Sequence, residues 1–276
     1  MKVIFLLFIM GFPVLSICQE IKHYYDNGQL SMVINGNIVK EYYKDGQPSR
    51  EGYFKMGVRD SIWKNWTEEG ILSLTYYDSN VIKNTKTYFK NGNIYAEYNY
   101  ESAHKKHGLC RVWYDNGQLR EEQYFNRGQL GNSNGWHIDG KLRIESNIKD
   151  SIRLTKAYYP NGQLNREFTE KYKNNIGWMH GTDKVWYENG QIKREGNYKD
   201  GKWNGTQKWW NEKGVLLFEN HMDMDKPVSG ISWYESGRLK SEVTYNKDGS
   251  KLNSKCFDED GNKRECEDWE FGQFKQ

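Results

Sequence analysis

The chain has 276 residues, a hydrophobic fraction of 36% and a mean hydropathy of −0.98. Such low hydropathy is typical of disordered chains, but 11 Trp, 20 Tyr and 11 Phe can bury large areas while scoring poorly on hydropathy scales, so we expect an ordered chain with a mainly aromatic core. The net charge of +3, with acids and bases interspersed, gives no reason to expect nucleic acid or anionic lipid as the main partner.

Residues 1–18 are typical of an export signal. Lys2 is the positive region, Val3–Leu15 is the apolar stretch, and Ser16 and Cys18 stand three and one residues before a cut after residue 18. The apolar stretch is short for a membrane span, and no transmembrane span is expected in the mature chain. We therefore expect an exported protein, periplasmic or secreted. The alternative is a lipoprotein signal that anchors the chain through Cys18, although Ile17 stands where such signals have a small residue.

An aromatic pair followed closely by Asn-Gly or Asp-Gly recurs through residues 19–276. The first copy reads Tyr24-Tyr25-Asp26-Asn27-Gly28-Gln29-Leu30. A fixed period of about 22–25 residues marks a tandem repeat architecture, here of about 10–12 repeats that shorten at the C-terminus. The turn glycines of the clear copies are Gly28, Gly46, Gly70, Gly92, Gly117, Gly162, Gly190, Gly214 and Gly237, a poorer copy surrounds Gly140, and two weak ones centre on Gly249 and Gly261.

Each copy predicts a β-hairpin. Asn-Gly or Asp-Gly between two strands favours a two-residue type I′ turn, in which both residues have positive φ. After each turn the sequence alternates, with Leu239, Val243 and Tyr245 apolar and the residues between them mostly polar, which predicts a strand with one buried and one solvated face. Short second turns such as Lys199–Gly205 link the hairpins. The predicted fold is an all-β, elongated antiparallel meander of tandem hairpins.

The residue four before each turn glycine is aromatic in every clear copy. A two-residue turn places Tyr114 opposite Leu119 on the buried face, and therefore puts the residue before Tyr114 on the other face, beside charged residues such as Arg120, Lys193 and Lys240. These aromatic residues either pack between neighbouring hairpins or form a row of binding anchors for a peptide, a glycan or a protein surface. We call this set the aromatic ladder: Tyr24, Tyr42, Trp66, Tyr88, Trp113, Tyr158, Trp186, Trp210 and Trp233.

Two cysteines flank the last weak copy. Cys256 and Cys266 lie five residues either side of Gly261, so a hairpin centred there places them opposite each other. Opposed Cα atoms are about 4.5–5.5 Å apart, which suits a disulfide in an oxidising compartment. The alternative is a pair of free thiols. Cys110 is expected to be a small buried residue.

No catalytic, cofactor or metal motif stands out, and we expect no enzyme activity and no cofactor. Gly135–Lys141 begins like a phosphate-binding loop, but Leu142 replaces the required Ser or Thr. His104 and His107 lack further metal ligands. The recurrent glutamates alternate with Lys or Arg, which favours cross-strand ion pairs over acid–base catalysis. These glutamates are Glu97, Glu121, Glu122, Glu167, Glu195 and Glu242.

The phrase from Trp186 to Gly205 strongly resembles the bacterial variant of the MORN repeat, and the resemblance extends over roughly residues 22–262. It is poor at residues 132–151, where the segment His137-Ile138-Asp139-Gly140 lacks the aromatic pair. The resemblance implies stacked hairpins in a twisted sheet and a role in protein contacts or, in some eukaryotic members, membrane association. Bacterial members are often labelled antitoxin-like, and the family has no general catalytic motif.

Three functions remain open. The first is an exported, non-catalytic protein-interaction or scaffold module whose protein partner is unknown. The second is a cell-envelope protein that binds a glycan or peptidoglycan. The third, which rests on the family labels alone, is an antitoxin-like or immunity-like protein that neutralises a toxin.

Overall fold

The computed structural model describes residues 20–102 and 104–267, and these residues form 24 β-strands and no helix. They divide into two compact units, unit 1 up to Lys83 and unit 2 from Asn84 onward, and the boundary falls inside β7 (Val81–Tyr88). The described residues therefore include no helix with the length and apolar character that a membrane crossing needs. The predicted export signal and Cys18 lie outside the described residues.

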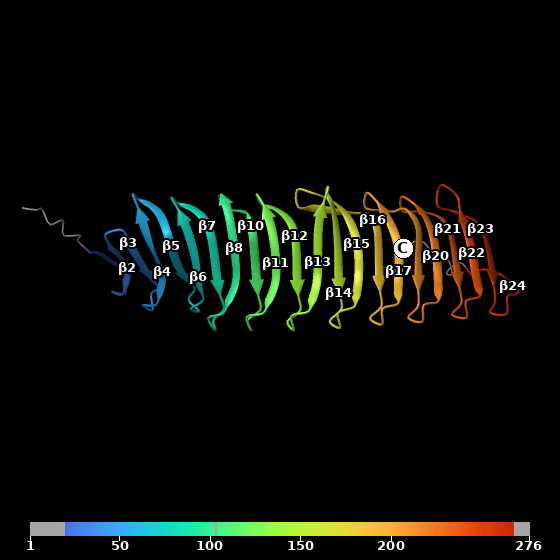
Figure 1. Cartoon of the computed structure of the whole chain (residues 1–276), viewed down its shortest axis with the longest axis horizontal. Coiled ribbons are helices and arrows are strands. Elements are labelled where there is room, and N and C mark those ends of the chain that lie inside the picture. Colours follow the sequence, from blue (N-terminus) through green and yellow to red (C-terminus); the bar gives the residue numbers. More distant parts are fainter. Residues whose placement is uncertain (1–19, 103, 268–276) are drawn as a thin grey trace, which may run out of the picture. The chain divides into compact units, whose positions relative to one another are not determined.

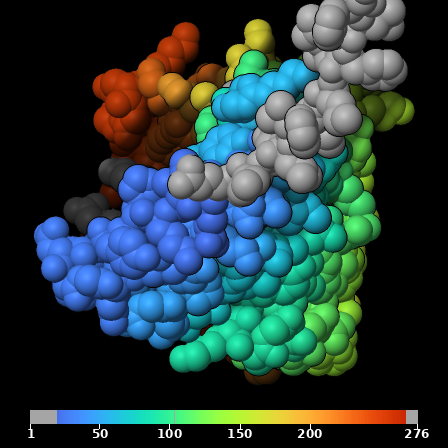
Figure 2. Space-filling model, turned by 90° about the vertical axis from the view of Figure 1, so that its left-hand side faces the viewer, coloured from blue at the N-terminus to red at the C-terminus, as the bar shows by residue number. Residues whose placement is uncertain are grey.

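Unit 1 is a meander of antiparallel strands in sequence order. Its strands are β1 (Ile21–Tyr24), β2 (Leu30–Asn35), β3 (Ile38–Tyr42), β4 (Pro48–Lys55), β5 (Val58–Trp66) and β6 (Leu72–Asp78). Each strand pairs with the next. All four residues of β1 are exposed, and they lie at the surface that faces the viewer in Figure 2.

Unit 2 repeats the same plan. Its further strands are β8 (Ile94–Ser102), β9 (Lys105–Lys106), β10 (Gly108–Trp113), β11 (Leu119–Asn126), β12 (Gln129–Trp136), β13 (Leu142–Lys149), β14 (Ile152–Tyr158), β15 (Leu164–Lys173), β16 (Ile176–Trp186), β17 (Ile192–Lys199), β18 (Lys202–Trp203), β19 (Gly205–Trp210), β20 (Leu216–Asp223), β21 (Lys226–Trp233), β22 (Leu239–Tyr245), β23 (Lys251–Phe257) and β24 (Lys263–Arg264). Successive hairpins follow one another in sequence order in Figure 1. The predicted all-β class and antiparallel meander are confirmed.

The glycine turns differ from the predicted type. Tyr25 N–H donates to Gln29 O at 2.8 Å and Gly28 N–H donates to Tyr25 O at 2.9 Å, which describes a three-residue loop. Gly28 has a φ of +79°, but Asn27 does not have a positive φ. Asn27 Oδ1 accepts a hydrogen bond from Gln29 N–H at 3.1 Å, which holds the loop as a type I turn followed by a left-handed glycine. The predicted two-residue type I′ turn is therefore wrong at these positions.

Type I′ turns occur instead at the second turns of the meander. Met56 and Gly57 both have positive φ and separate the paired residues Lys55 and Val58. Asp200 and Gly201 do the same between β17 and β18. The two kinds of turn alternate along the chain, so each repeat combines a three-residue loop with a two-residue loop. The weak copy around Gly249 joins β22 to β23 and so takes the place of a second turn.

The extra loop residue shifts the strand register. Trp113 pairs with Leu119 and Val112 pairs with Glu121, which leaves Arg120 as a β-bulge. Tyr114 therefore does not face Leu119, as the two-residue turn predicted. Similar shifts follow almost every glycine turn, and the β5–β6 hairpin, in which Trp66 pairs with Leu72 and Asn65 with Ser73, has none.

The bulge also changes which residues are buried. The bulge inserts one extra residue, so side chains beyond it point to the opposite face from the one that alternation alone would give. Leu239 therefore pairs with Trp233 on one face, while Val243 is buried on the other. Nearly all fully buried side chains stand five or seven residues before a turn glycine, or four or six after it, and we call this the inner face. They are Val39, Trp63, Ala96, Cys110, Val112, Ser146, Thr155, Asp183, Gln207, Asn220, Ser232, Ser241 and Val243.

The inner face is not the mainly aromatic core that composition suggested. Trp63 is buried, but its neighbours along the face include polar pairs such as Ser146 with Thr155 and Ser232 with Ser241, whose hydroxyl oxygens are 2.7 Å apart. Most aromatic rings are half-buried, because a single layer of sheet covers each ring on one side only. These two hydroxyl pairs satisfy one another across neighbouring strands, whereas Gln207 Oε1 and Asn220 Oδ1 are buried without a hydrogen-bond partner among the described residues.

Candidate functional site

The aromatic ladder lies on the face opposite the buried row, which we call the outer face. Side chains alternate along a strand, and each ladder residue directly follows an inner-face residue. Every ladder residue pairs with the residue two after the turn glycine, as Trp186 does with Ile192 and Trp210 with Leu216. Aromatic and mostly aliphatic side chains thus alternate in one row near the glycine turns of each unit, and we call this row the outer stripe.

The ladder side chains are half-buried, except Tyr24, which is 60% exposed. The sequence left two alternatives for these rings, packing between hairpins or exposure as binding anchors. Half-burial combines them, because each ring packs on its neighbours and also keeps one side available to solvent. In unit 2 the stripe contains Tyr88, Trp113, Tyr158, Trp186, Trp210 and Trp233, and in unit 1 it contains Tyr24, Tyr42 and Trp66.

Two members of the stripe were missed in the sequence. Trp136 pairs with Leu142 as the other ladder residues pair with their partners, and Phe257 pairs with Lys263 before the last turn. Both stand four residues before a turn glycine, so the spacing could have found them. In the copy around Gly140, His137 replaces the second residue of the aromatic pair. The first residue of the pair, Trp136, is present and joins the stripe.

A row of ion pairs runs beside the outer stripe. Lys and Arg six residues before the turn glycines meet Glu five residues after them, as in Lys86–Glu97 at 3.2 Å and Lys184–Glu195 at 3.1 Å. The expected cross-strand pairing is therefore confirmed for the glutamates that stand five residues after a glycine. Their pairs are Lys86–Glu97, Arg111–Glu122, Lys156–Glu167, Lys184–Glu195 and Lys255–Glu242. Glu121 lies on the inner face, 3.7 Å from Arg120 and 3.9 Å from Arg143.

The second residue of the aromatic pair joins neighbouring repeats. Tyr187 Oη donates to the backbone oxygen of Trp210 at 2.8 Å, which is the ladder residue of the next repeat. The same bond recurs wherever this position is a tyrosine within the described copies, and we call these bonds the tyrosine tethers. They are Tyr25–Tyr42, Tyr43–Trp66, Tyr114–Trp136, Tyr159–Trp186, Tyr187–Trp210 and Tyr234–Phe257.

Two lysines do not lie where the sequence predicted. Lys193 and Lys240 lie over the rings of Tyr187 and Tyr234, at 5.2 and 5.5 Å, and not beside the ladder residues. Burial, and then the charge of Glu212, raise the pKa of Tyr187. Each tether holds the backbone at one ladder position relative to the repeat before it, so neighbouring copies of the outer stripe are fixed to each other wherever a tether is present.

The turn asparagines add a second link between repeats. Asn189 Nδ2 donates to Glu212 O at 2.9 Å and Asn91 Nδ2 donates to Asp115 O at 2.9 Å. The Oδ1 of each residue accepts a backbone N–H within its own turn. An Asp at the same position cannot donate to the next repeat. An Asn at this position can therefore link two repeats, as Asn91, Asn161 and Asn189 do.

The residues considered for other chemistry are placed as follows. Gly135 lies within β12, Gly140 lies in a β-turn, and β13 begins at Leu142, so no helix follows the lysine of the phosphate-loop-like segment. His107 Nδ1 accepts a hydrogen bond from Arg127 N–H at 3.4 Å. Within the described ranges, no cluster of three or more His, Cys, Asp or Glu residues is arranged to hold a metal ion.

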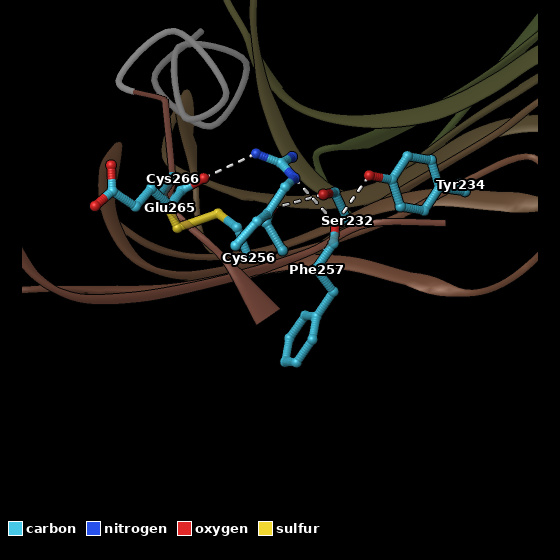
Figure 3. The surroundings of a disulfide bond; sticks show 8 residues. Ser232, Tyr234, Cys256, Phe257, Glu265 and Cys266 are labelled. Atoms are coloured by element: carbon cyan, nitrogen blue, oxygen red, sulfur yellow. Dashed lines mark hydrogen bonds between the residues drawn. A yellow bond between two sulfur atoms is a disulfide. The ribbon is translucent and has the colours of Figure 1, made fainter. Parts of the chain in front are cut away.

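Cys256 and Cys266 form a disulfide, with Cα atoms 5.3 Å apart (Figure 3). The expected register is wrong, because Cys256 pairs with Arg264 and Cys266 lies two residues beyond β24. The disulfide packs with Val243 and Tyr245 at the end of unit 2. Cys110 is buried and free, and burial raises the pKa of its thiol.

Five segments of the chain match the MORN repeat variant family: residues 36–56, 106–127, 154–174, 179–200 and 230–247. Each segment contains one glycine turn, so the family resemblance is confirmed for five repeats, while a bacterial or antitoxin-like subfamily stays a prediction. MORN repeats generally mediate protein or membrane interactions. No curated protein matches the chain.

Two solved structures are similar over 86% of this chain, which spans 15% of the length of each matched chain. One is the complex TcdB2-TccC3-Cdc42, at 12% identity and a TM-score of 0.18. The other is the Tc holotoxin pore of Photorhabdus luminescens with a mutated TccC3, at 10% identity and a TM-score of 0.19. Similarity at this level carries no argument about function.

Proposed function

We propose that this chain, in which five segments match the MORN repeat variant, is an exported, non-catalytic protein that holds a protein partner on its outer stripe. The observation that carries this proposal is the row of half-buried aromatic side chains along one face of unit 2, which continues through Trp113, Trp136, Tyr158, Trp186, Trp210 and Trp233.

The composition of this surface favours a protein partner. Tyr and Trp are enriched among the residues that dominate binding energy at protein interfaces, and polar groups surround such anchors. The ion-pair row supplies that polar border. Because its charges are already paired, it favours orientation of a partner over general attraction to an anionic surface.

The tyrosine tethers support the same proposal. Each tether fixes the backbone of one ladder residue relative to the repeat before it, so the backbone of the tethered copies is already ordered before a partner binds. Ordering of loops and side chains on binding costs free energy, and a backbone held in advance reduces the loop part of that cost. A stripe of this kind also lengthens with each added repeat, which suits a scaffold.

The first experiment is affinity capture with the mature chain and its ladder variants. Trp113→Ala and Trp186→Ala should reduce recovery of a specific partner by about tenfold or more, since anchor residues typically contribute about 2 kcal/mol or more. The control is Trp178→Ala, which removes a 37% exposed tryptophan that pairs with Lys171 away from the stripe. Circular dichroism must show that all three variants fold. Equal recovery of the partner by ladder variants and control would reject the stripe as the binding surface.

Export is a separate part of the proposal and rests on residues 1–18. Mass spectrometry of the protein recovered from a bacterial host separates the two signals considered above. Cleavage after residue 18 gives a chain that begins at Gln19, whereas a lipoprotein begins at a lipid-modified Cys18. An uncleaved chain that starts at Met1 would contradict export by either route.

A glycan is the second candidate, because a row of flat rings also suits sugar faces. Peptidoglycan fragments and a panel of oligosaccharides should then quench tryptophan fluorescence, and the quenching should disappear in the Trp113→Ala variant. No change across the panel would remove this candidate. Rescue of cells from a toxin encoded next to this protein would favour the antitoxin-like role, which rests on family labels alone.

A further inference from the structure

The inner face of unit 2 contains a hollow of about 300 Å³ that the proposed function does not use. Its lining residues are Arg166, Val185, Lys193, Arg194 and Trp209. Arg166 pairs with Val185, Val185 with Arg194, and Arg194 with Trp209, so these four residues form one row across β15, β16, β17 and β19. Lys193 is the bulge residue directly before Arg194.

The hollow carries excess positive charge. Asp183 is fully buried and accepts a hydrogen bond from Arg166 Nε at 2.7 Å and another from Arg194 Nη2. None of the residues that line the hollow is acidic, and Lys193 Nζ lies 5.2 Å from the ring centre of Tyr187. Three cations around one carboxylate leave a net charge of 3 − 1 = +2.

Both arginines keep hydrogen-bond donors for a ligand. A guanidinium has five N–H donors, and Asp183 takes one from each arginine. Their side chains are 36% and 27% exposed, so donors other than the buried Arg194 Nε can reach a ligand. The Arg166 guanidinium lies 4.4 Å from the ring centre of Phe168 and that of Arg194 lies 5.3 Å from Trp203, which fixes both guanidinium groups in place.

We propose that this hollow binds the C-terminal residue of a protein partner, with the terminal carboxylate on the two arginines and Lys193, and an apolar side chain on Val185 and Trp209. Guanidinium groups match the planar carboxylate, and the excess charge supplies the complement. The apolar wall requires that the anion carry an apolar group close to it.

The position of these two groups favours a chain terminus. In an extended peptide, adjacent side chains point to opposite faces, and residues two apart are separated by roughly 7 Å. A carboxylate and an apolar side chain can therefore enter one small hollow together when both leave the same Cα atom, as they do at a C-terminal residue. This inference rests on the proposed function for the class of partner, but it uses the other face of the sheet.

The probes are N-acetyl-leucine, its amide N-acetyl-leucinamide, and the α-amide of N-acetyl-aspartic acid, whose only carboxylate is on the side chain. Titration calorimetry with the full chain should give at least about tenfold tighter binding for N-acetyl-leucine than for either other compound, because only it presents both groups from one Cα atom. Raising NaCl from about 0.05 to about 0.5 M should weaken the binding. Equal binding of the leucine acid and amide would overturn the proposal. Equal binding of the aspartyl compound would also overturn it, in favour of an internal acidic residue.

Lys193→Met tests the charge without disturbing the bonds to Asp183. It should weaken N-acetyl-leucine binding by about threefold, since an exposed charge contributes at most about 1 kcal/mol. The matched control is Lys240→Met, which removes the lysine at the same position two glycine turns further on, over Tyr234. Equal effects of the two variants would overturn the assignment of the hollow, as would tighter binding of inorganic phosphate than of N-acetyl-leucine.

Trp113→Ala separates this inference from the proposed function. It changes the outer stripe and should leave binding of N-acetyl-leucine unchanged. If Trp113→Ala loses partner capture and the full chain does not bind N-acetyl-leucine, the assignment of the hollow is overturned while the proposed function of the outer stripe stands. If N-acetyl-leucine binds and Trp113→Ala captures the partner as well as the unchanged chain does, the outer stripe is rejected while the assignment of the hollow stands.

Discussion

Removal of one tyrosine tether tests how the repeats of unit 2 hold together. Tyr187→Phe deletes a single oxygen atom, whose hydrogen bond to Trp210 O has the 2.8 Å length of a good O–H···O bond. A neutral hydrogen bond of this kind contributes about 1 kcal/mol to the free energy of unfolding. The ring itself is retained, so packing against Lys193 should survive.

Urea denaturation followed by circular dichroism measures the loss. With an m value of about 2 kcal/mol/M, the unfolding midpoint should fall by about 0.5 M. Tyr88→Phe is the control, because Tyr88 is a half-buried ladder residue of the same unit and is not the donor of any tyrosine tether. Equal losses in both variants, or none in Tyr187→Phe, would show that the tethers do not stabilise the repeats.

Three further predictions follow from contacts in each unit. Gly52→Ala should destabilise unit 1 by about 3 kcal/mol in urea denaturation, because the new Cβ would lie 2.0 Å from the buried Trp63 ring. An additional Trp63→Leu change should restore part of the lost stability. An unchanged unfolding midpoint in Gly52→Ala would contradict this packing. Burial and a hydrogen bond to a glutamate raise the pKa of Tyr158 to about 12. Its contribution to stability is therefore complete below the unfolded pKa of about 10 and should be lost as the pH rises towards 12; Tyr158→Phe should weaken this pH dependence, measured by denaturation at both ends of the range. Reduction of the Cys256–Cys266 disulfide, which joins residues 10 apart, should lower the stability of the C-terminal end by about 3 kcal/mol; a double Cys→Ser variant with unchanged stability would contradict it.

The repeat architecture could be predicted from the sequence because its signals are local. An Asn-Gly turn between alternating segments specifies a hairpin whatever surrounds it, and its recurrence specifies a tandem array. The aromatic residue four before each glycine was found in the same way. Its neighbours were not, because Trp113 shares its face with Leu119, which the two-residue turn would have put on the opposite face. Trp136 was missed because the copy was judged by its second aromatic residue, and the structure shows that the first one alone is enough to extend the stripe.

The turn type and the register could not be obtained from the same pattern. Asn-Gly suits both a two-residue turn with two positive φ values and a three-residue loop with one, and the difference is a single residue. That residue decides whether Leu239 and Val243 share a face, and the structure places them on opposite faces. The pairing of Asp183 with two arginines was also beyond the sequence, because it needs the register of three neighbouring strands.

The tyrosine tethers are not continuous along unit 2. Phe89, His137 and Asn211 occupy the tyrosine position in three copies, and none of these side chains has a phenolic hydroxyl. The tethers thus link the copies at Gly117 and Gly140, those at Gly162, Gly190 and Gly214, and those at Gly237 and Gly261. Each linked group should unfold locally as one cooperative unit. Amide hydrogen exchange should therefore show the lowest protection in the strands between these groups, where local opening begins.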